Sequence, residues 1–86
     1  MRVTVQCFAR LRDLAGRHEW PCEVADGATV ADVWQQLAGA FPAVSAMRGA
    51  VSCAVNADFA SMDTVVRDGD DVAFLPPVSG GAPADS

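Results

Sequence analysis

The residues in this chain best suited to chemistry lie near its end, in the run Phe74-Leu75-Pro76-Pro77-Val78-Ser79-Gly80-Gly81. The two prolines fix φ and remove two backbone donors, so we expect the segment to leave the fold as an extended arm. Gly80 and Gly81 carry no side chain, so the tip of that arm would fit a channel too narrow for any other residue. The residues that follow, 82–86, are small and polar, and we expect them to form a flexible extension.

The side chains that usually perform catalysis are scarce. His18 is the one histidine of the chain, and its charged neighbours predict a solvated surface residue rather than a base. The cysteines, Cys7, Cys22 and Cys53, are too widely spaced for a disulfide framework or a zinc knuckle. Their strand parity predicts buried, reduced thiols. No glycine-rich phosphate loop and no metal-ligand cluster follow from the sequence, so neither a cofactor nor a metal site is predicted.

Acidic residues gather around Gly69, at Asp68, Asp70 and Asp71. We interpret this group as turn chemistry, because aspartate side chains accept hydrogen bonds from the nearby backbone. Calcium binding is the alternative interpretation, although the spacing does not match that of an EF-hand loop.

The composition predicts one small globular domain. The chain has 86 residues, of which 51% are hydrophobic, and no apolar run approaches the length of a membrane span. Its first residues enter a strand pattern directly, so we predict no signal peptide and no membrane partner. Reduced cysteines are typical of the cytoplasm, which is the expected location.

The charge pattern bears on the kind of partner. The net charge is −5, there is no lysine, and the nearest approach to a basic cluster is Arg10, Arg12 and Arg17. Nucleic acid is not expected, because binding it needs a basic face. An acidic surface instead suits basic protein partners. The alternative is that the charge only keeps the protein soluble.

Hydrophobic periodicity divides the first half of the chain into strand, short helix, strand and helix. Alternating residues predict strands over 2–8 and 18–24, joined by a short helix over 9–15. Pro21 places the second strand at an edge or a bulge. The main helix begins after a cap at Thr29, follows an apolar stripe, and stops near Gly39 and Pro42.

The second half reads as short strands separated by turns. A loop over 41–49, with a turn of helix near 44–47, precedes a strand over 51–55. Residues 59–66 are predicted to be irregular or a short strand. In the last strand Val72 and Phe74 are expected to point inward, whereas Leu75 has the opposite parity and is expected to face outward.

This order predicts an α+β domain with a ubiquitin-like β-grasp roll, in which one main helix packs on one face of a mixed sheet. The domain would span residues 1–81, with the arm at 75–81. Phe59 and Leu75 are two large apolar side chains expected to be partly exposed near the arm. They predict an interaction patch, with unrelated single exposures as the alternative.

These segments resemble the small (MoaD-type) subunit of molybdopterin synthase, a ubiquitin-like sulfur carrier of the MoaD/ThiS family. The resemblance runs from Arg2 to Gly81 and rests on residues 8–16, 29–33 and 54–56, and above all on residues 68–81. The order of turn, strand, double proline and diglycine in that last segment makes the resemblance specific.

The resemblance implies a chemistry for the arm. An enzyme similar to ubiquitin-activating proteins would adenylate the carboxylate of Gly81, and sulfur would then replace the adenylate to give a thiocarboxylate. The arm would insert into the large (MoaE-type) synthase subunit, where such sulfurs form the dithiolene of molybdopterin. The carrier would be a sulfur-donating subunit without catalytic side chains of its own. The residues that would contact partners are Phe59, Phe74, Leu75, Pro76, Pro77, Val78, Ser79 and Gly80.

Residues 82–86 depart from this pattern, because they follow the glycine that should bear the sulfur. A peptidase could remove them, the extension could be tolerated, or the protein could have lost carrier activity. Two other functions therefore stay open. One is a sulfur carrier for cysteine or thiamine biosynthesis activated by proteolysis, and the other is a ubiquitin-like binding module without transferable sulfur.

Overall fold

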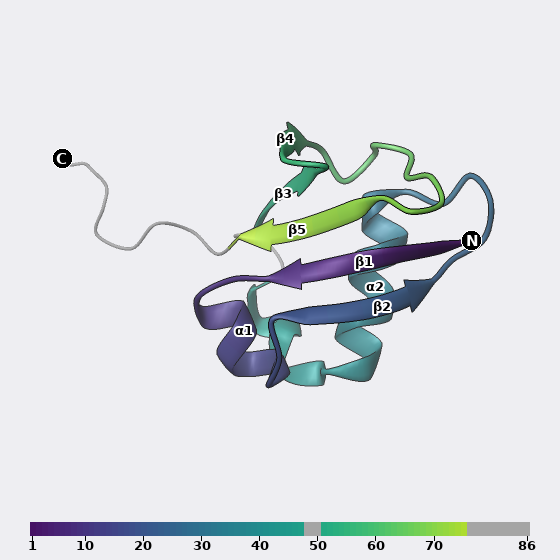
Figure 1. Ribbon diagram of the computed structural model, residues 1–86. Helices are drawn as coiled ribbons and strands as arrows, with labels where there is room; N and C mark the ends of the chain where they lie inside the picture. Colours follow the sequence, from purple (N-terminus) through teal and green to yellow (C-terminus); the bar gives the residue numbers. More distant parts are fainter. Residues whose placement is uncertain (48–50, 76–86) are drawn as a thin grey trace, which may run out of the picture.

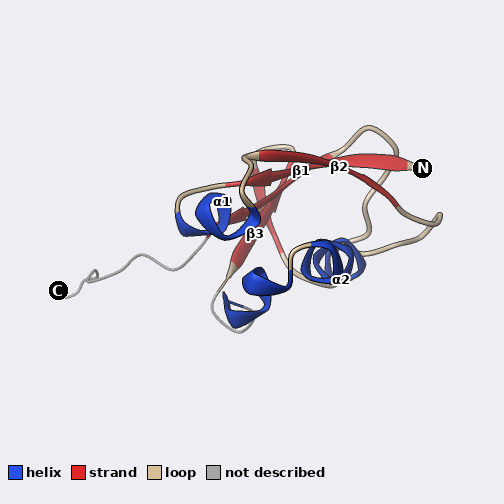
Figure 2. Cartoon of the chain, turned by 90° about the horizontal axis from the view of Figure 1, so that it is seen from below, coloured by secondary structure: helices blue, strands red, loops and turns tan. Residues whose placement is uncertain are grey.

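The computed structural model describes residues 1–47 and 51–75, which form a mixed sheet with helices packed on one of its faces (Figure 1, Figure 2). The predicted arm beyond Leu75 and the extension lie outside the described residues. In chain order the elements are β1 (Arg2–Cys7), α1 (Arg10–Ala15), β2 (Glu19–Glu23), α2 (Val30–Ala40), η1 (Pro42–Met47), β3 (Ser52–Val55), β4 (Asp58–Ala60) and β5 (Asp71–Leu75).

The strand order in the sheet is β2-β1-β5-β3-β4. The two central strands, β1 and β5, run parallel, and the other neighbouring pairs are antiparallel. The main helix α2 lies behind the sheet in the view of Figure 1. This is the predicted α+β, ubiquitin-like β-grasp arrangement, with the last strand inserted beside the first.

The core lies between the sheet and α2, and strand parity explains which residues enter it. Alternate residues of the two central strands point toward the helix, and the apolar stripe of α2 faces them. The fully buried side chains of this layer include Val3, Val5, Cys7, Val30, Val33, Leu37, Val72 and Phe74.

The start of α2 follows the predicted cap. The Thr29 hydroxyl accepts a hydrogen bond from the amide of Asp32 at 3.4 Å, and the Asp32 carboxylate accepts one from the amide of Thr29 at 2.9 Å. This reciprocal pair satisfies two amides that the first turn leaves without helical partners. The helix continues through Gly39 to Ala40, and Pro42 then begins the 3-10 helix η1, which is longer than the expected single turn.

The edge strand β2 has the predicted proline. Pro21 is exposed and pairs with Thr4 in the register of β1 and β2. Trp20 lies on the same face as the buried Cys22 but is only half-buried, because the sheet ends there. Its ring meets Phe41 edge to face, with centroids 5.6 Å apart.

The hairpin between β3 and β4 turns on two residues in the left-handed region. Asn56 has φ of 51° and Ala57 has φ of 73°. Two positive φ values in a two-residue loop define the type I′ geometry, which matches the twist of a hairpin. Strand β4 begins directly after this turn, at Asp58, and ends at Ala60, so the first residues of the predicted irregular segment or short strand over 59–66 are in a strand.

Candidate functional site

Strand β5 delivers the predicted arm from the centre of the sheet. Because β1 and β5 are parallel, both end on the same side of the molecule, which we call the arm-exit end. The register pairs Cys7 with Phe74 on one flank and Ser52 with Leu75 on the other. The start of the arm is therefore held between two neighbouring strands. The predicted arm residues that lie outside the described residues are Pro76, Pro77, Val78, Ser79, Gly80 and Gly81.

The structure corrects the expectation that Phe74 contacts a partner. Its side chain is 0% exposed. The ring packs edge to face against Trp34 of α2, with centroids 5.0 Å apart. Parity had predicted this inward orientation, and the resemblance had suggested a surface contact. Phe74 instead anchors the end of β5 in the core, so that the arm leaves from a fixed point.

Phe59 and Leu75 lie on the face of the sheet that the helices do not cover. Phe59 is 86% exposed and pairs with Ala54, which in turn pairs with Ala73 of β5. Leu75 is two residues beyond Ala73, so it shares this face, and it is half-buried. Its outward orientation confirms the parity prediction. The side chains of Ala54 and Ala73 are too small to cover the Phe59 ring, which stays exposed to solvent.

Phe8 is a further exposed apolar residue, and the sequence interpretation gave it no functional role. It follows Cys7, the partner of Phe74, and is 46% exposed. This exposure shows that its ring is not buried under the end of β1. The signal was its position out of phase with the β1 alternation. We call Phe8, Phe59 and Leu75 the arm-exit patch.

The acidic turn before β5 uses its carboxylates to hold the backbone. Asp68 accepts a hydrogen bond from the amide of Arg2 at 2.8 Å, and Asp70 accepts one from the amide of Arg67 at 2.8 Å. Asp70 also accepts from the side-chain amide of Asn56 at 2.9 Å. The predicted turn chemistry accounts for these side chains. Among residues 1–47 and 51–75, no group of histidine, cysteine and carboxylate side chains could hold a metal ion.

The cysteines are unsuited to nucleophilic catalysis. Cys7, Cys22 and Cys53 are free and buried, as predicted. Burial raises the pKa of each thiol, and the nearby Glu23 carboxylate raises the pKa of Cys22 further. A raised pKa keeps the thiol protonated and unreactive. His18 is exposed and lies in the connection before β2.

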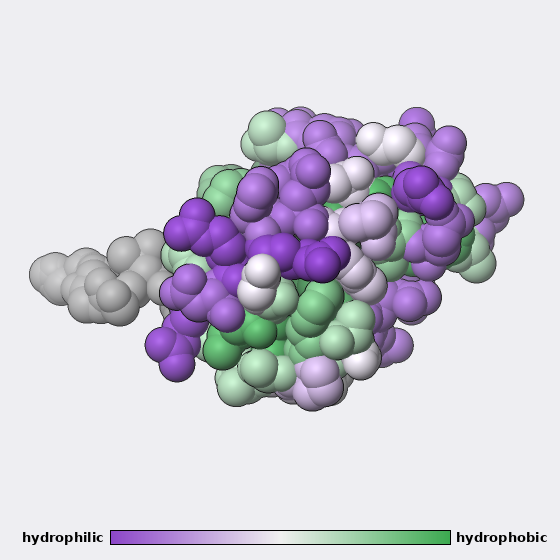
Figure 3. Space-filling model, turned by 60° about the horizontal axis from the view of Figure 1, so that its bottom comes forward, coloured by the Kyte–Doolittle hydropathy of each residue, from purple (hydrophilic) through white to green (hydrophobic). Residues whose placement is uncertain are grey.

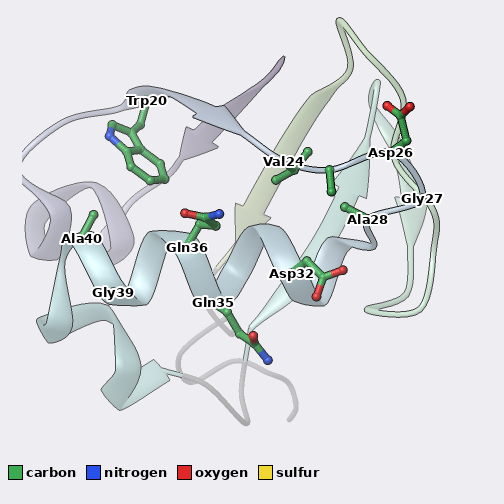
Figure 4. Close-up of a pocket in the computed structure, with 11 residues that line it drawn as sticks. Trp20, Val24, Asp26, Gly27, Ala28, Asp32, Gln35, Gln36, Gly39 and Ala40 are labelled. Carbon is green, nitrogen blue, oxygen red and sulfur yellow. The ribbon is translucent and has the colours of Figure 1, made fainter. Parts of the chain in front are cut away.

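A groove of about 700 Å³ lies between β2 and α2 (Figure 4). Trp20, Val24 and Gln36 are among its lining residues. The Gln36 side chain donates to the carbonyl of Glu23 at 3.3 Å, and Pro21 removes an amide from the strand edge above it. The groove is at the edge of the sheet opposite β4, away from the arm-exit patch.

No helix in the described part of the chain is long and apolar enough to cross a membrane.

The geometry defines a ubiquitin-like β-grasp protein whose last strand, β5, pairs with the first and finishes at Leu75, at the arm-exit end. A comparison with protein families matches residues 5–81 to the ThiS family. The molybdopterin synthase sulfur carrier subunit of Chlamydomonas reinhardtii is 35% identical, over 94% of this chain and 100% of that protein. The one of Mycobacterium tuberculosis is 37% identical, over 94% of this chain and 99% of that protein.

A solved structure of similar fold is SAMP1 of Haloferax volcanii, with a TM-score of 0.85 and 31% identity over 94% of this chain and 100% of that one. The chain therefore belongs to the ThiS family, and it is a sulfur carrier of the ThiS/MoaD type.

Proposed function

We propose that this protein is the sulfur-carrying small subunit of a molybdopterin synthase. The observation that carries the proposal is where the family match stops. It ends at residue 81, the second glycine of the arm, and leaves residues 82–86 outside. The names of the two curated relatives support molybdopterin synthase as the destination of the sulfur.

In this proposal the carboxylate of Gly81 is the group that reacts. A carboxylate is a poor electrophile, so it first attacks the α-phosphate of ATP and releases pyrophosphate, which leaves an acyl adenylate. A sulfur nucleophile then attacks the acyl carbon, the C–S bond forms, and AMP departs. The product is a thiocarboxylate, and adenylation supplies the leaving group that the carboxylate lacks. The activating protein is the ubiquitin-activating-like enzyme that the resemblance implies.

The carrier's own residues position this chemistry. Buried Phe74 and its contact with Trp34 fix the end of β5. The exposed arm-exit patch offers apolar surface to the large synthase subunit beside the arm. Pro76 and Pro77 stiffen the arm. Val78 and Ser79 extend it, Gly80 passes the narrow part of the partner's channel, and Gly81 brings the sulfur to the acceptor.

The residues after Gly81 require a processing step in this proposal. An amide bond to Ala82 has no free carboxylate for adenylation, so a peptidase must cleave after Gly81. The alternatives remain a carrier for cysteine or thiamine biosynthesis and a binding module that transfers no sulfur. They differ in the fate of Gly81 and in the partner that accepts the arm.

A reconstitution with the large subunit, the activating enzyme, ATP, a sulfide source and a cyclic pyranopterin phosphate as the sulfur acceptor tests the proposal. We expect the chain ending at Gly81 to support formation of molybdopterin, and the chain through Ser86 to do so only after cleavage. A chain ending at Gly80 serves as the matched control, because it keeps the fold and shortens the arm by one residue. Equal activity of the Gly80 chain and the Gly81 chain would contradict the proposal.

A further inference from the structure

The connection between β1 and β2 places positive charge at the arm-exit end. Arg10 and Arg12 lie on α1, Arg17 follows it, and all of them are exposed. The amide of Cys7 donates to the carbonyl of His18 at 2.8 Å, and Cys7 pairs with Phe74. Residues 10–17 are therefore tethered at both ends beside the exit of β5 (Figure 1, Figure 2).

The negative charge gathers at the other end of the sheet. There β1 and β5 begin, β2 and β3 end, and the acidic turn before β5 closes on Arg2. The acidic residues of this end are Glu23, Asp26, Asp58, Asp68, Asp70 and Asp71. The net charge of −5 thus hides a separation of charge along the strands. It does not describe the end of the sheet at which β5 finishes, where Arg10, Arg12 and Arg17 lie.

The arginines of α1 stand free enough to act on a partner. Within residues 1–47 and 51–75, no ion pair joins Arg10 or Arg12 to a carboxylate. The guanidinium of Arg17 lies over the Phe41 ring, 5.7 Å from its centroid. Asp13 is the one acid within residues 10–17, and Glu19, which starts β2 at the same end, accepts a hydrogen bond from the Gln6 side chain at 3.0 Å. Hydrophilic side chains accordingly gather over α1 at the left of the space-filling view (Figure 3).

We propose that residues 10–17 form a cationic docking surface for an acidic rim around the channel of the large synthase subunit. This inference rests on the proposed function, which supplies a channel for the arm. Phe8 of the arm-exit patch lies two residues before Arg10 in the chain. Exposed charges at the rim of an interface change the encounter rate and orientation more than the affinity. Their effect weakens as salt rises, because charges are screened beyond about 8 Å at physiological ionic strength. They turn the arm, rather than the acidic end, toward the partner.

The test compares association rates of two matched charge reversals with the large subunit of the same organism. Arg12→Glu changes the arm-exit end, and Arg67→Glu makes the same change of charge at the acidic end. Both arginines are exposed. The wild-type carrier and both variants are purified from the native host. We expect Arg12→Glu to slow association about fivefold at low salt, and Arg67→Glu to leave the rate within about twofold of wild type. High salt should remove the difference.

Three results would overturn the inference. Equal slowing by the two reversals would show that only net charge matters. Faster association of Arg12→Glu would show that the facing surface is basic. A wild-type rate that does not depend on salt would exclude steering and leave the carrier function standing. If the wild-type protein does not bind the large subunit at all, the proposed function itself is wrong, and the inference falls with it.

Discussion

At the scale of single residues, Phe59 and Phe74 are expected to have different roles, because Phe59 is exposed for binding a partner and Phe74 is buried in the core. Phe59 is 86% exposed and Phe74 is 0% exposed. Replacing Phe59 with serine should change the free energy of unfolding by less than about 0.5 kcal/mol and weaken binding to the large subunit by about tenfold or more. Phe74→Ala should instead lower the free energy of unfolding by about 3–5 kcal/mol. Urea unfolding and a binding titration measure both effects.

The Phe59 prediction has a clear negative outcome. If Phe59→Ser binds the large subunit as tightly as wild type, the exposed ring is a single surface exposure and not part of an interface. If it unfolds as easily as Phe74→Ala, the ring packs somewhere that the described structure does not show.

The buried thiols predict a pH dependence of stability. Burial raises the pKa of Cys7, Cys22 and Cys53 above the ordinary value of 9.0. As the pH rises through that value, the unfolded chain loses thiol protons before the folded chain does. The unfolded state then binds fewer protons, so stability is full below about pH 9 and falls above it.

The composition leaves few other titrating groups that could contribute to this pH dependence. The chain has no lysine and no tyrosine, so few other side chains titrate in the same range. Urea unfolding at about pH 7 and about pH 10 should show the loss. A Cys7→Val variant should show a smaller loss than wild type. A free energy of unfolding that does not change over this range would contradict the burial of the thiols.

The alternation of residues along a strand correctly predicted the orientation of individual side chains. It predicted that Phe74 points inward and that Leu75 points outward, and both orientations are confirmed. The resemblance alone had assigned Phe74 to a surface contact, which its burial contradicts. Phe8 could not be placed from the sequence, because its exposure depends on where β1 ends and on which strand lies beside it.

At the scale of elements, the hairpin between β3 and β4 carries backbone strain. Ala57 adopts φ of 73°, in the left-handed region that L-residues with a Cβ disfavour. Ala57→Gly should therefore raise the free energy of unfolding by about 0.5–1 kcal/mol. Gly69→Ala is the opposite control, because Gly69 has φ of +87° and nothing lies within 4 Å of an added Cβ.

Gly69→Ala should destabilise through the backbone alone, since its new methyl group meets no atom. Urea unfolding of the two variants checks the pair. A destabilising Ala57→Gly would show that the turn is not strained and that the methyl group of Ala57 contributes to stability.

The elements with strong periodic patterns could be predicted, and those shaped by neighbours could not. The α2 helix had both an apolar stripe and a cap at Thr29, and the structure has both. Strand β4 has three residues, and it exists because Phe59 and its neighbours pair with β3. No local pattern of that length distinguishes a strand from a loop.

At the scale of the whole molecule, the strand order shows how the charges are distributed, which the composition does not. The net charge of −5 suggested basic partners. The parallel pairing of β1 and β5 instead places Arg10 and Arg12 near the end of β5 and the acidic turn at the opposite end of the sheet. Such a separation could not be predicted without the strand order, because residues distant in sequence share each end of the sheet.

The central claim concerns the fate of Gly81, and the intact mass of the protein purified from its own cells tests it most directly. We predict a chain that ends at Gly81, with part of the population heavier by the exchange of one oxygen for sulfur. Treatment that hydrolyses a thiocarboxylate should return that fraction to the mass of the carboxylate. Working synthase complexes that contain only chains extending past Gly81 would contradict the account.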